Sequence, residues 1–139
     1  MKKLSLVLAA LALVACSKAP VVKQGTASTE IDNHGATETI TVNVTLEDDK
    51  LTKVEIDETY KGSTKKTLGE DYAMRAASPI GKEWFEQAEF LEEYLVKNNK
   101  TELALTADGV PTDADVLAGC TIGVESIMKT VAEAAKAAK

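Results

Sequence analysis

Residues 37–56 read TETITVNVTLEDDKLTKVEI, and this stretch decides the fold of the chain. Over residues 37–46, polar and apolar side chains alternate, which is the period of a strand with one buried face. Residues 47–50 (EDDK) supply a turn, and residues 51–56 resume the apolar pattern. The stretch therefore predicts an antiparallel hairpin.

The segment after the hairpin changes to helical spacing. Residues 60–66 are polar and predict a loop, and residues 68–77 predict a short helix interrupted by Gly69. Ser78 and Pro79 suit the N-cap and the first position of a longer helix that runs to Lys97. Its apolar residues recur every three to four positions, at Ile80, Trp84, Ala88, Leu91 and Leu95.

The C-terminal third predicts one more strand and a long helix. Residues 103–105 alternate and indicate a third strand, and residues 107–114 form a loop. A helix then begins near Gly123, with an apolar stripe at Val124, Ile127, Met128, Val131 and Ala135. The order strand, strand, helix, strand, helix predicts an α+β fold, in which a small antiparallel sheet packs against helices.

The N-terminus has the pattern of an export signal. Lys2 and Lys3 precede an apolar run over residues 4–14, which is shorter than the roughly 20 residues that a membrane span needs. The run ends in LVAC, residues 13–16, which resembles a bacterial lipobox. That resemblance implies a signal peptide at residues 1–15 and a lipid on Cys16. The alternative is an ordinary signal peptide.

The next segment predicts a tether, and the remainder predicts one domain. Residues 16–35 are rich in Ser, Lys, Pro, Gly, Thr and Asn and show no clear period, so we expect a lipidated flexible tether there. Residues 36–139 are long enough for a single core. We expect this domain on the extracytoplasmic face of the cell membrane.

Charge and cysteine content exclude some functions. The formal charge is −6 and only 4% of the residues are aromatic, which argues against nucleic acid as a partner. Apart from Cys16, Cys120 is the other cysteine, and the chain has one His. We therefore expect neither a disulfide framework nor a Cys/His metal site.

One motif points to a cofactor. Residues 115–122 read DVLAGCTI, which resembles the flavinylation motif D-x-x-[ST]-G-A-T of the FMN-binding domain family. Asp115, Gly119 and Thr121 match at the right spacing. Ala118 stands where Ser or Thr is usual, and Cys120 stands where Ala is usual. The resemblance extends over about residues 36–139, through the pieces STKK (63–66), DYAM (71–74) and SPIGKEW (78–84).

The resemblance implies an electron carrier rather than an enzyme with its own substrate. In that family, the last Thr of the motif is esterified to the phosphate of FMN by a separate flavin transferase. Thr121 would be this acceptor, and Asp115 would belong to what the transferase recognises. A membrane quinone or dehydrogenase would supply electrons, and an external acceptor would receive them.

Physical chemistry gives an independent interpretation of the motif. Thr121 lies at the predicted N-terminus of a helix, where free N–H groups favour an anion such as phosphate. Gly119 permits a close backbone approach and a positive φ. The alternative is purely structural: Thr121 caps the helix, and Asp115 and Gly119 shape the turn before it.

Other residues are candidates to surround the flavin. Tyr72, Met74 and Trp84 offer the apolar and aromatic surface typical of ligand pockets, although Trp84 also fits the core face of its helix. Residues 65–66 are two lysines that either face the flavin or its phosphate, or lie in a solvated loop. We expect Cys120 to be a buried, unreactive thiol, because reactive cysteines need an electropositive and exposed setting.

A second Gly-Ala-Thr sequence lies near the N-terminus of the domain. Residues 34–37 read HGAT, but Asp32 is one residue too close and a strand follows, so Thr37 is not expected to be an acceptor.

The rival function is a lipoprotein that binds a ligand or partner without a cofactor. Its signal peptide would in some cases be released as a peptide pheromone.

Overall fold

The computed structural model of the protein describes residues 17–139. The predicted signal peptide and Cys16 lie outside the described residues. The described elements are, in chain order, β1 (Val22–Asn33), β2 (Ala36–Glu47), β3 (Lys50–Tyr60), β4 (Ser63–Thr64), α1 (Lys65–Leu68), the 3₁₀ helix η1 (Gly69–Tyr72), α2 (Trp84–Asn98), α3 (Ala114–Leu117) and α4 (Glu125–Ala137).

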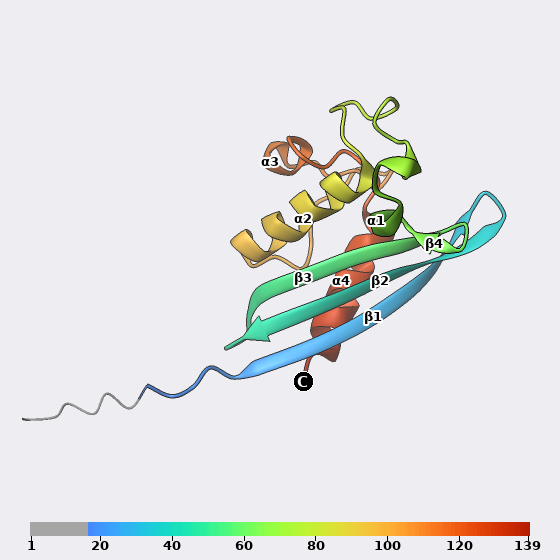
Figure 1. Cartoon of the computed structure of the whole chain (residues 1–139). Coiled ribbons are helices and arrows are strands. Elements are labelled where there is room, and N and C mark those ends of the chain that lie inside the picture. Colours follow the sequence, from blue (N-terminus) through green and yellow to red (C-terminus); the bar gives the residue numbers. More distant parts are fainter. Residues whose placement is uncertain (1–16) are drawn as a thin grey trace, which may run out of the picture.

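The sheet is antiparallel, in the order β1-β2-β3-β4, and it confirms the predicted hairpin (Figure 1). Val42 pairs with Ile56 and Val44 with Val54. Two-residue turns join the strands, and each turn has positive φ at both residues: 55° and 85° at residues 34–35, 49° and 63° at residues 48–49, and 49° and 82° at residues 61–62. Such turns match the natural twist of paired strands.

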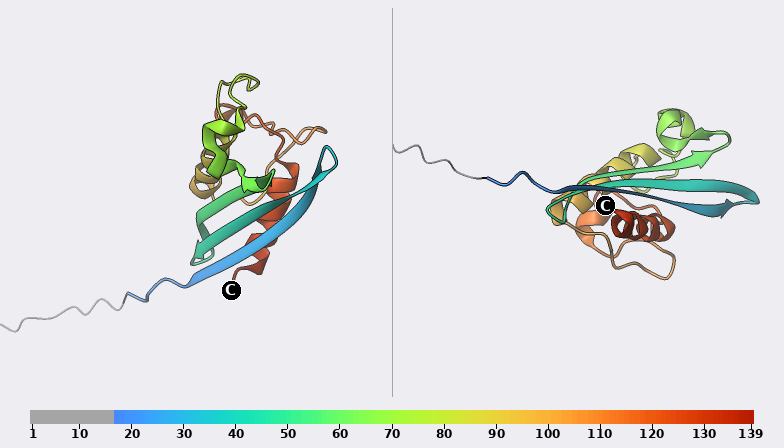
Figure 2. Two further views of the ribbon diagram at one scale, coloured as in Figure 1. Left: turned by 45° about the vertical axis from the view of Figure 1, so that its right-hand side comes forward. Right: turned by 90° about the horizontal axis from the view of Figure 1, so that it is seen from below.

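Two long helices, α2 and α4, pack against the sheet and enclose the core. α4 passes behind the strands in Figure 1 and lies on one side of them when seen from below in Figure 2. α2 runs beside β3, where Glu92 accepts a hydrogen bond from the N–H of Ile56 and Asn99 accepts one from the N–H of Leu51. Apolar side chains from the sheet, α2 and α4 form one buried cluster. The α+β architecture and the long C-terminal helix are therefore as predicted.

The predicted tether is wrong over most of its length, because residues 22–33 form β1. The inward-facing residues of this strand include Gly25, Ala27 and Thr29, which are small rather than strongly apolar. α4 packs close enough to require this: a Cβ at Gly25 would lie 2.0 Å from the carbonyl oxygen of Ala134. Exposure alternates along the strand, but the usual hydrophobic signal is missing from its sequence.

The predicted start of the long helix is also wrong. α2 begins at Trp84, and the Glu86 side chain accepts a hydrogen bond from the N–H of Glu83 there. Ser78 Oγ instead accepts from the N–H groups of Ile80 and Lys82, and these local bonds hold the segment in a loop. The remaining apolar positions of the predicted helix, from Trp84 to Leu95, are buried as expected.

Two shorter elements differ from prediction. The helix expected over residues 68–77 is wrong over half its length: α1 starts earlier and ends at Leu68, η1 ends at Tyr72, and residues 73–77 are not helical. Gly69 takes a positive φ of 54° where α1 and η1 meet. The third strand expected over residues 103–105 reduces to a single bridge between Leu105 and Pro111. Pro111 lacks the N–H that would extend a ladder there.

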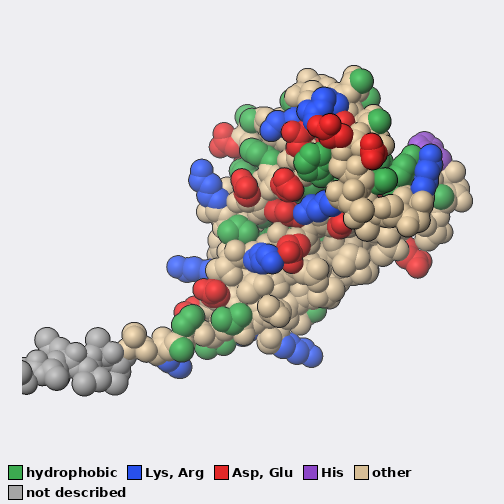
Figure 3. All heavy atoms as spheres, in the orientation of Figure 1, with side chains coloured by type: hydrophobic (Ala, Val, Ile, Leu, Met, Phe, Trp, Pro, Cys, Tyr) green, Lys and Arg blue, Asp and Glu red, His purple; other side chains and the backbone are tan. Residues whose placement is uncertain are grey.

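The other face of the sheet is open to solvent. It carries Thr26, Ser28, Thr41 and Asn43, with hydrogen bonds of 2.7 Å between Thr26 and Asn43 and 3.2 Å between Ser28 and Thr41. Figure 3 shows few hydrophobic side chains over these strands. Within residues 17–139, no helix is long and apolar enough to cross a membrane.

Candidate functional site: a cavity beside Thr121

A cavity of about 380 Å³ opens where the far ends of the strands meet the start of α4. Its wall combines side chains from β1, β2 and β3, from α1 to α2, from the loop at residues 108–109, and from residues 122–127. This volume lies in the range of small-molecule pockets, which runs from about 300 to 1,000 Å³. Segments that are up to 96 residues apart in the sequence thus share one site.

One wall of the cavity is aromatic and contains all three side chains that the sequence proposed for flavin contact. Tyr72, Met74 and Trp84 line the cavity together. Trp84 is only 3% exposed, so it belongs to the core as well as to the pocket. Tyr72 meets Tyr60 edge to face, with 4.9 Å between ring centroids. Tyr60 therefore packs against this wall.

A buried ion pair adds charge to the aromatic wall. Lys65 Nζ lies 2.7 Å from Glu58 Oε1, and both side chains are more than nine-tenths buried. The same ammonium lies 4.9 Å from the centroid of Tyr72 and 5.2 Å from that of Trp84. Cations in this position are attracted to the ring faces. The cavity thus offers a positive group beside two aromatic rings.

This ion pair was not predicted from the sequence. Lys65 was expected either to face the flavin or its phosphate or to lie in a solvated loop, and no role was predicted for Glu58. The signal was present, because Glu58 continues the inward series of Val54 and Ile56 at every second residue. Lys66 is half-buried outside the cavity, where it pairs with Glu92 of α2.

Thr121 lies next to the cavity but not at the start of a helix. The residues that follow it, Ile122 and Gly123, line the cavity, whereas α4 begins only at Glu125. The expected position is wrong because other bonds hold the segment extended: the N–H of Thr121 donates to Gln87, and the N–H of Val124 donates to Gly109 O at 2.7 Å. Thr121 itself is half-buried.

The start of α4 contributes its first turn to the cavity wall. Glu125, Ser126 and Ile127 line the cavity, and among residues 17–139 no side chain caps this helix. Free N–H groups at a helix start attract an anion. The acidic residues Asp32, Asp108 and Glu125 also line the cavity, so this end of the site is polar and its charged side chains are negative.

Gly119 and Cys120 are buried parts of the motif. A Cβ at Gly119 would lie 2.3 Å from the ring of Phe90, so the close approach is confirmed, whereas the expected positive φ is not observed. Cys120 is fully buried, and burial raises the pKa of its thiol to about 11. The expectation that this thiol is buried is therefore confirmed.

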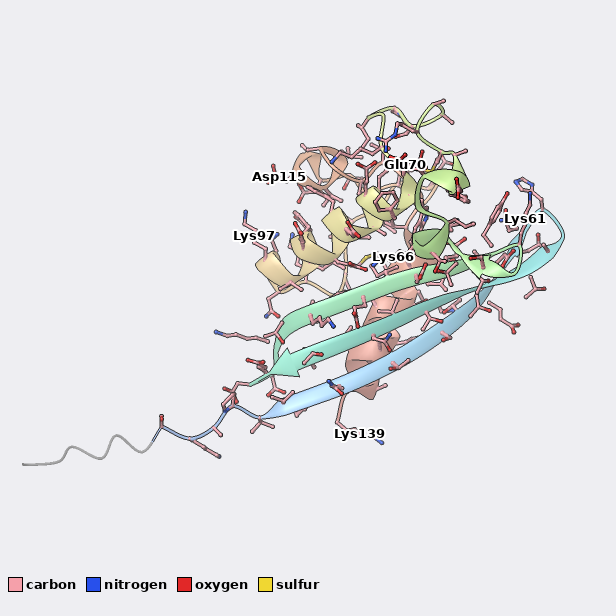
Figure 4. All side chains as sticks on the ribbon, viewed as in Figure 1. Lys61, Lys66, Glu70, Lys97, Asp115 and Lys139 are labelled. Carbon is pink, nitrogen blue, oxygen red and sulfur yellow. The ribbon has the colours of Figure 1, made fainter. Side chains whose placement is uncertain are left out.

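Asp115 and Ala118 face a separate groove. Both are exposed and line a depression of about 440 Å³ together with Phe90, Tyr94 and Lys97. Figure 4 shows Asp115 and Lys97 on the same side of the molecule, away from Lys61 at the strand ends. The motif thus has an exposed part at Asp115 and Ala118, a buried part at Gly119 and Cys120, and Thr121 beside the cavity. Thr37 lies in β2, consistent with its exclusion as an acceptor.

Comparison with known proteins agrees with this geometry. The chain is similar to a protein from Clostridium thermocellum whose structure was solved in solution by NMR, with 27% sequence identity and a TM-score of 0.50; the match covers 81% of this chain and 89% of that one. No curated protein matches. Residues 35–136 match the model of the FMN-binding domain family, which spans most of the chain. The protein therefore belongs to the FMN-binding domain family.

Proposed function

We propose that this protein is an electron carrier in which FMN is joined to Thr121 through its phosphate. The observation that carries the proposal is the position of Thr121: it immediately precedes two residues of the wall of an aromatic cavity. An ester on Thr121 would place the flavin within reach of that cavity. Bound FMN would supply reversible uptake of electrons, and the protein would supply position and environment.

The residues present suit this cofactor. Half-buried Tyr72 offers flat, apolar surface to a fused aromatic ring, and Trp84, which is almost fully buried, forms the base of the same wall. Lys65 adds a cation to the same wall. When the cavity holds no other anion, the Glu58 carboxylate balances the charge of this cation. The backbone at Gly123 leaves room beside the acceptor, because the nearest atom to a Cβ there is 3.6 Å away.

Membrane attachment through Cys16 is part of the same proposal. Cys16 would carry lipid after removal of residues 1–15, which would hold the protein on the extracytoplasmic face. Because β1 begins at Val22, only residues 17–21 separate this anchor from the sheet. A membrane quinone or dehydrogenase would donate electrons. Covalent attachment is useful in this location, since FMN lost outside the cell could not be recaptured.

The two departures from the motif favour one rival. Ala118 and Cys120 replace the usual residues, so the chain could keep the fold and act as a cofactor-free binding lipoprotein. Ala118 is exposed, where a transferase would meet it, whereas Cys120 is buried. The rival therefore depends chiefly on position 118.

Co-expression of the mature domain with a flavin transferase separates the two functions. We expect a yellow protein whose intact mass includes one FMN, and whose flavin stays attached after denaturation. Thr121→Ala should abolish the covalent flavin, while Thr37→Ala should leave it unchanged. A colourless wild-type protein would support the cofactor-free rival, and covalent flavin on the Thr121→Ala protein would show that the acceptor is another residue.

A further inference from the structure

Gln87, which no sequence argument singled out, holds Thr121 from inside the protein. Its side chain is fully buried on α2. Its amide oxygen accepts hydrogen bonds from both the N–H and the hydroxyl of Thr121, at 2.8 and 3.3 Å. Its amide nitrogen donates to Ser78 Oγ and to the carbonyl of Lys82, both at 3.2 Å. One side chain thus joins three segments.

The chemistry of these partners fixes the orientation of the amide. The backbone N–H of Thr121 can only donate, and the carbonyl of Lys82 can only accept. If the amide were turned over, both of these buried contacts would be lost. The amide oxygen therefore faces Thr121, and the Thr121 hydroxyl is the donor in their shared bond. Lone pairs on the hydroxyl oxygen remain available on its other side.

We propose that Gln87 is a positioning residue for flavin attachment, an inference that rests on the proposed role of Thr121 as acceptor. In the attachment step, Thr121 Oγ forms a bond to a phosphorus of a flavin phosphoanhydride, the anhydride bond breaks, and a nucleoside monophosphate leaves. The hydroxyl proton passes to a base of the transferase, because a neutral amide oxygen is too weak a base to keep it. Gln87 holds the oxygen still while it attacks.

The same contact serves the attached state. The ester has no hydroxyl hydrogen, so the 3.3 Å bond is lost on attachment, whereas the 2.8 Å bond from the Thr121 N–H is retained. Gln87 therefore keeps the backbone of the modified residue fixed against α2. Since α2 also begins with Trp84 in the cavity wall, Gln87 sets the acceptor in register with the aromatic surface.

Gln87→Met tests this inference, because methionine has a similar length and no amide. We expect the transferase to modify this variant with a kcat about tenfold or more below that of wild type, since small misplacements of a reacting group have effects of this size. KM for the protein substrate should change by less than about twofold, because Asp115 and its exposed surface are intact. Exchange of the Thr121 amide hydrogen in the unmodified protein should also accelerate.

Ile56→Val is the matched control, since Ile56 is buried in the core but is not part of the cavity wall. This variant should lose stability and keep the wild-type kcat. The inference is overturned if Gln87→Met is modified at the wild-type rate, or if Ile56→Val slows to the same extent. Failure of the wild-type protein to accept flavin at all would overturn the proposed function, and this inference with it.

Discussion

Replacing Gly119 by alanine should destabilise the protein through one contact. The new Cβ would lie 2.3 Å from Cγ and Cδ2 of Phe90 and 2.5 Å from Cδ1. Ordinary carbon contacts lie at about 3.5–4.0 Å, so the ring or the loop has to move by about 1 Å. Overpacking of this kind costs about 1–3 kcal/mol. The lower entropy of the unfolded alanine chain returns about 0.4–1 kcal/mol, which leaves a net loss of about 1–2 kcal/mol.

Urea unfolding measures this loss as a lower midpoint with an unchanged m-value. Gly123→Ala is the control, because it lies in the same loop, does not have a positive φ, and its Cβ would meet only Asp108 O at 3.6 Å. That variant should be as stable as wild type or slightly more so. Adding Phe90→Leu to Gly119→Ala should recover part of the loss. Equal stability of Gly119→Ala and wild type would refute the contact argument.

Three further predictions concern charge and anchoring. Burial in the folded state raises the pKa of the Cys120 thiol to about 11, so the unfolded chain loses this proton first as the pH rises from about 9. The free energy of unfolding should therefore fall by up to about 1.4 kcal/mol per pH unit between pH 9 and 11. Cys120→Ala should lack this pH-dependent component. Lys65→Met should cost about 3–5 kcal/mol, because it leaves the Glu58 carboxylate buried without its cation, and adding Glu58→Gln should restore part of this stability in urea titrations. Cys16→Ser should block lipid attachment and processing at this site. A Cys16→Ser protein that is still membrane-bound and begins at residue 16 in mass spectrometry would contradict the prediction of a lipobox.

Elements with a strong apolar period were predictable from the sequence. The alternation over residues 37–56 and the stripe of α4 gave the correct hairpin and the correct C-terminal helix, since burial on one face leaves a direct trace in residue type. β1 left no such trace, because its inward-facing residues are small, and α4 lies so close to it that Gly25 has no room for a side chain. The helix start predicted at Ser78-Pro79 was wrong for another reason. The Ser78 hydroxyl accepts hydrogen bonds from nearby N–H groups in a loop and does not cap a helix.

The candidate site was predictable in its parts but not in its assembly. The motif and the resemblance identified Thr121, and aromatic character suggested Tyr72 and Trp84. The contribution of Gln87 depends on Thr121, which lies 34 positions further along the chain. A polar residue on a helix gives no local sign of such a partner, because its side chain would look the same in an exposed position.

If Cys16 carries the proposed lipid, the conversion of the expected tether into β1 determines where the cavity lies relative to the membrane. Ile31, which lines the cavity, is nine residues along β1 from Val22, and strands rise about 3.3 Å per residue. The cavity is thus displaced by about 30 Å along a rigid strand from the start of β1. The five residues before β1 reach less than about 20 Å even when extended. In the proposed membrane-bound state, an upright domain would therefore keep its cavity well above the bilayer. Of the two proposed donors, this favours a dehydrogenase that projects from the membrane over a quinone within it.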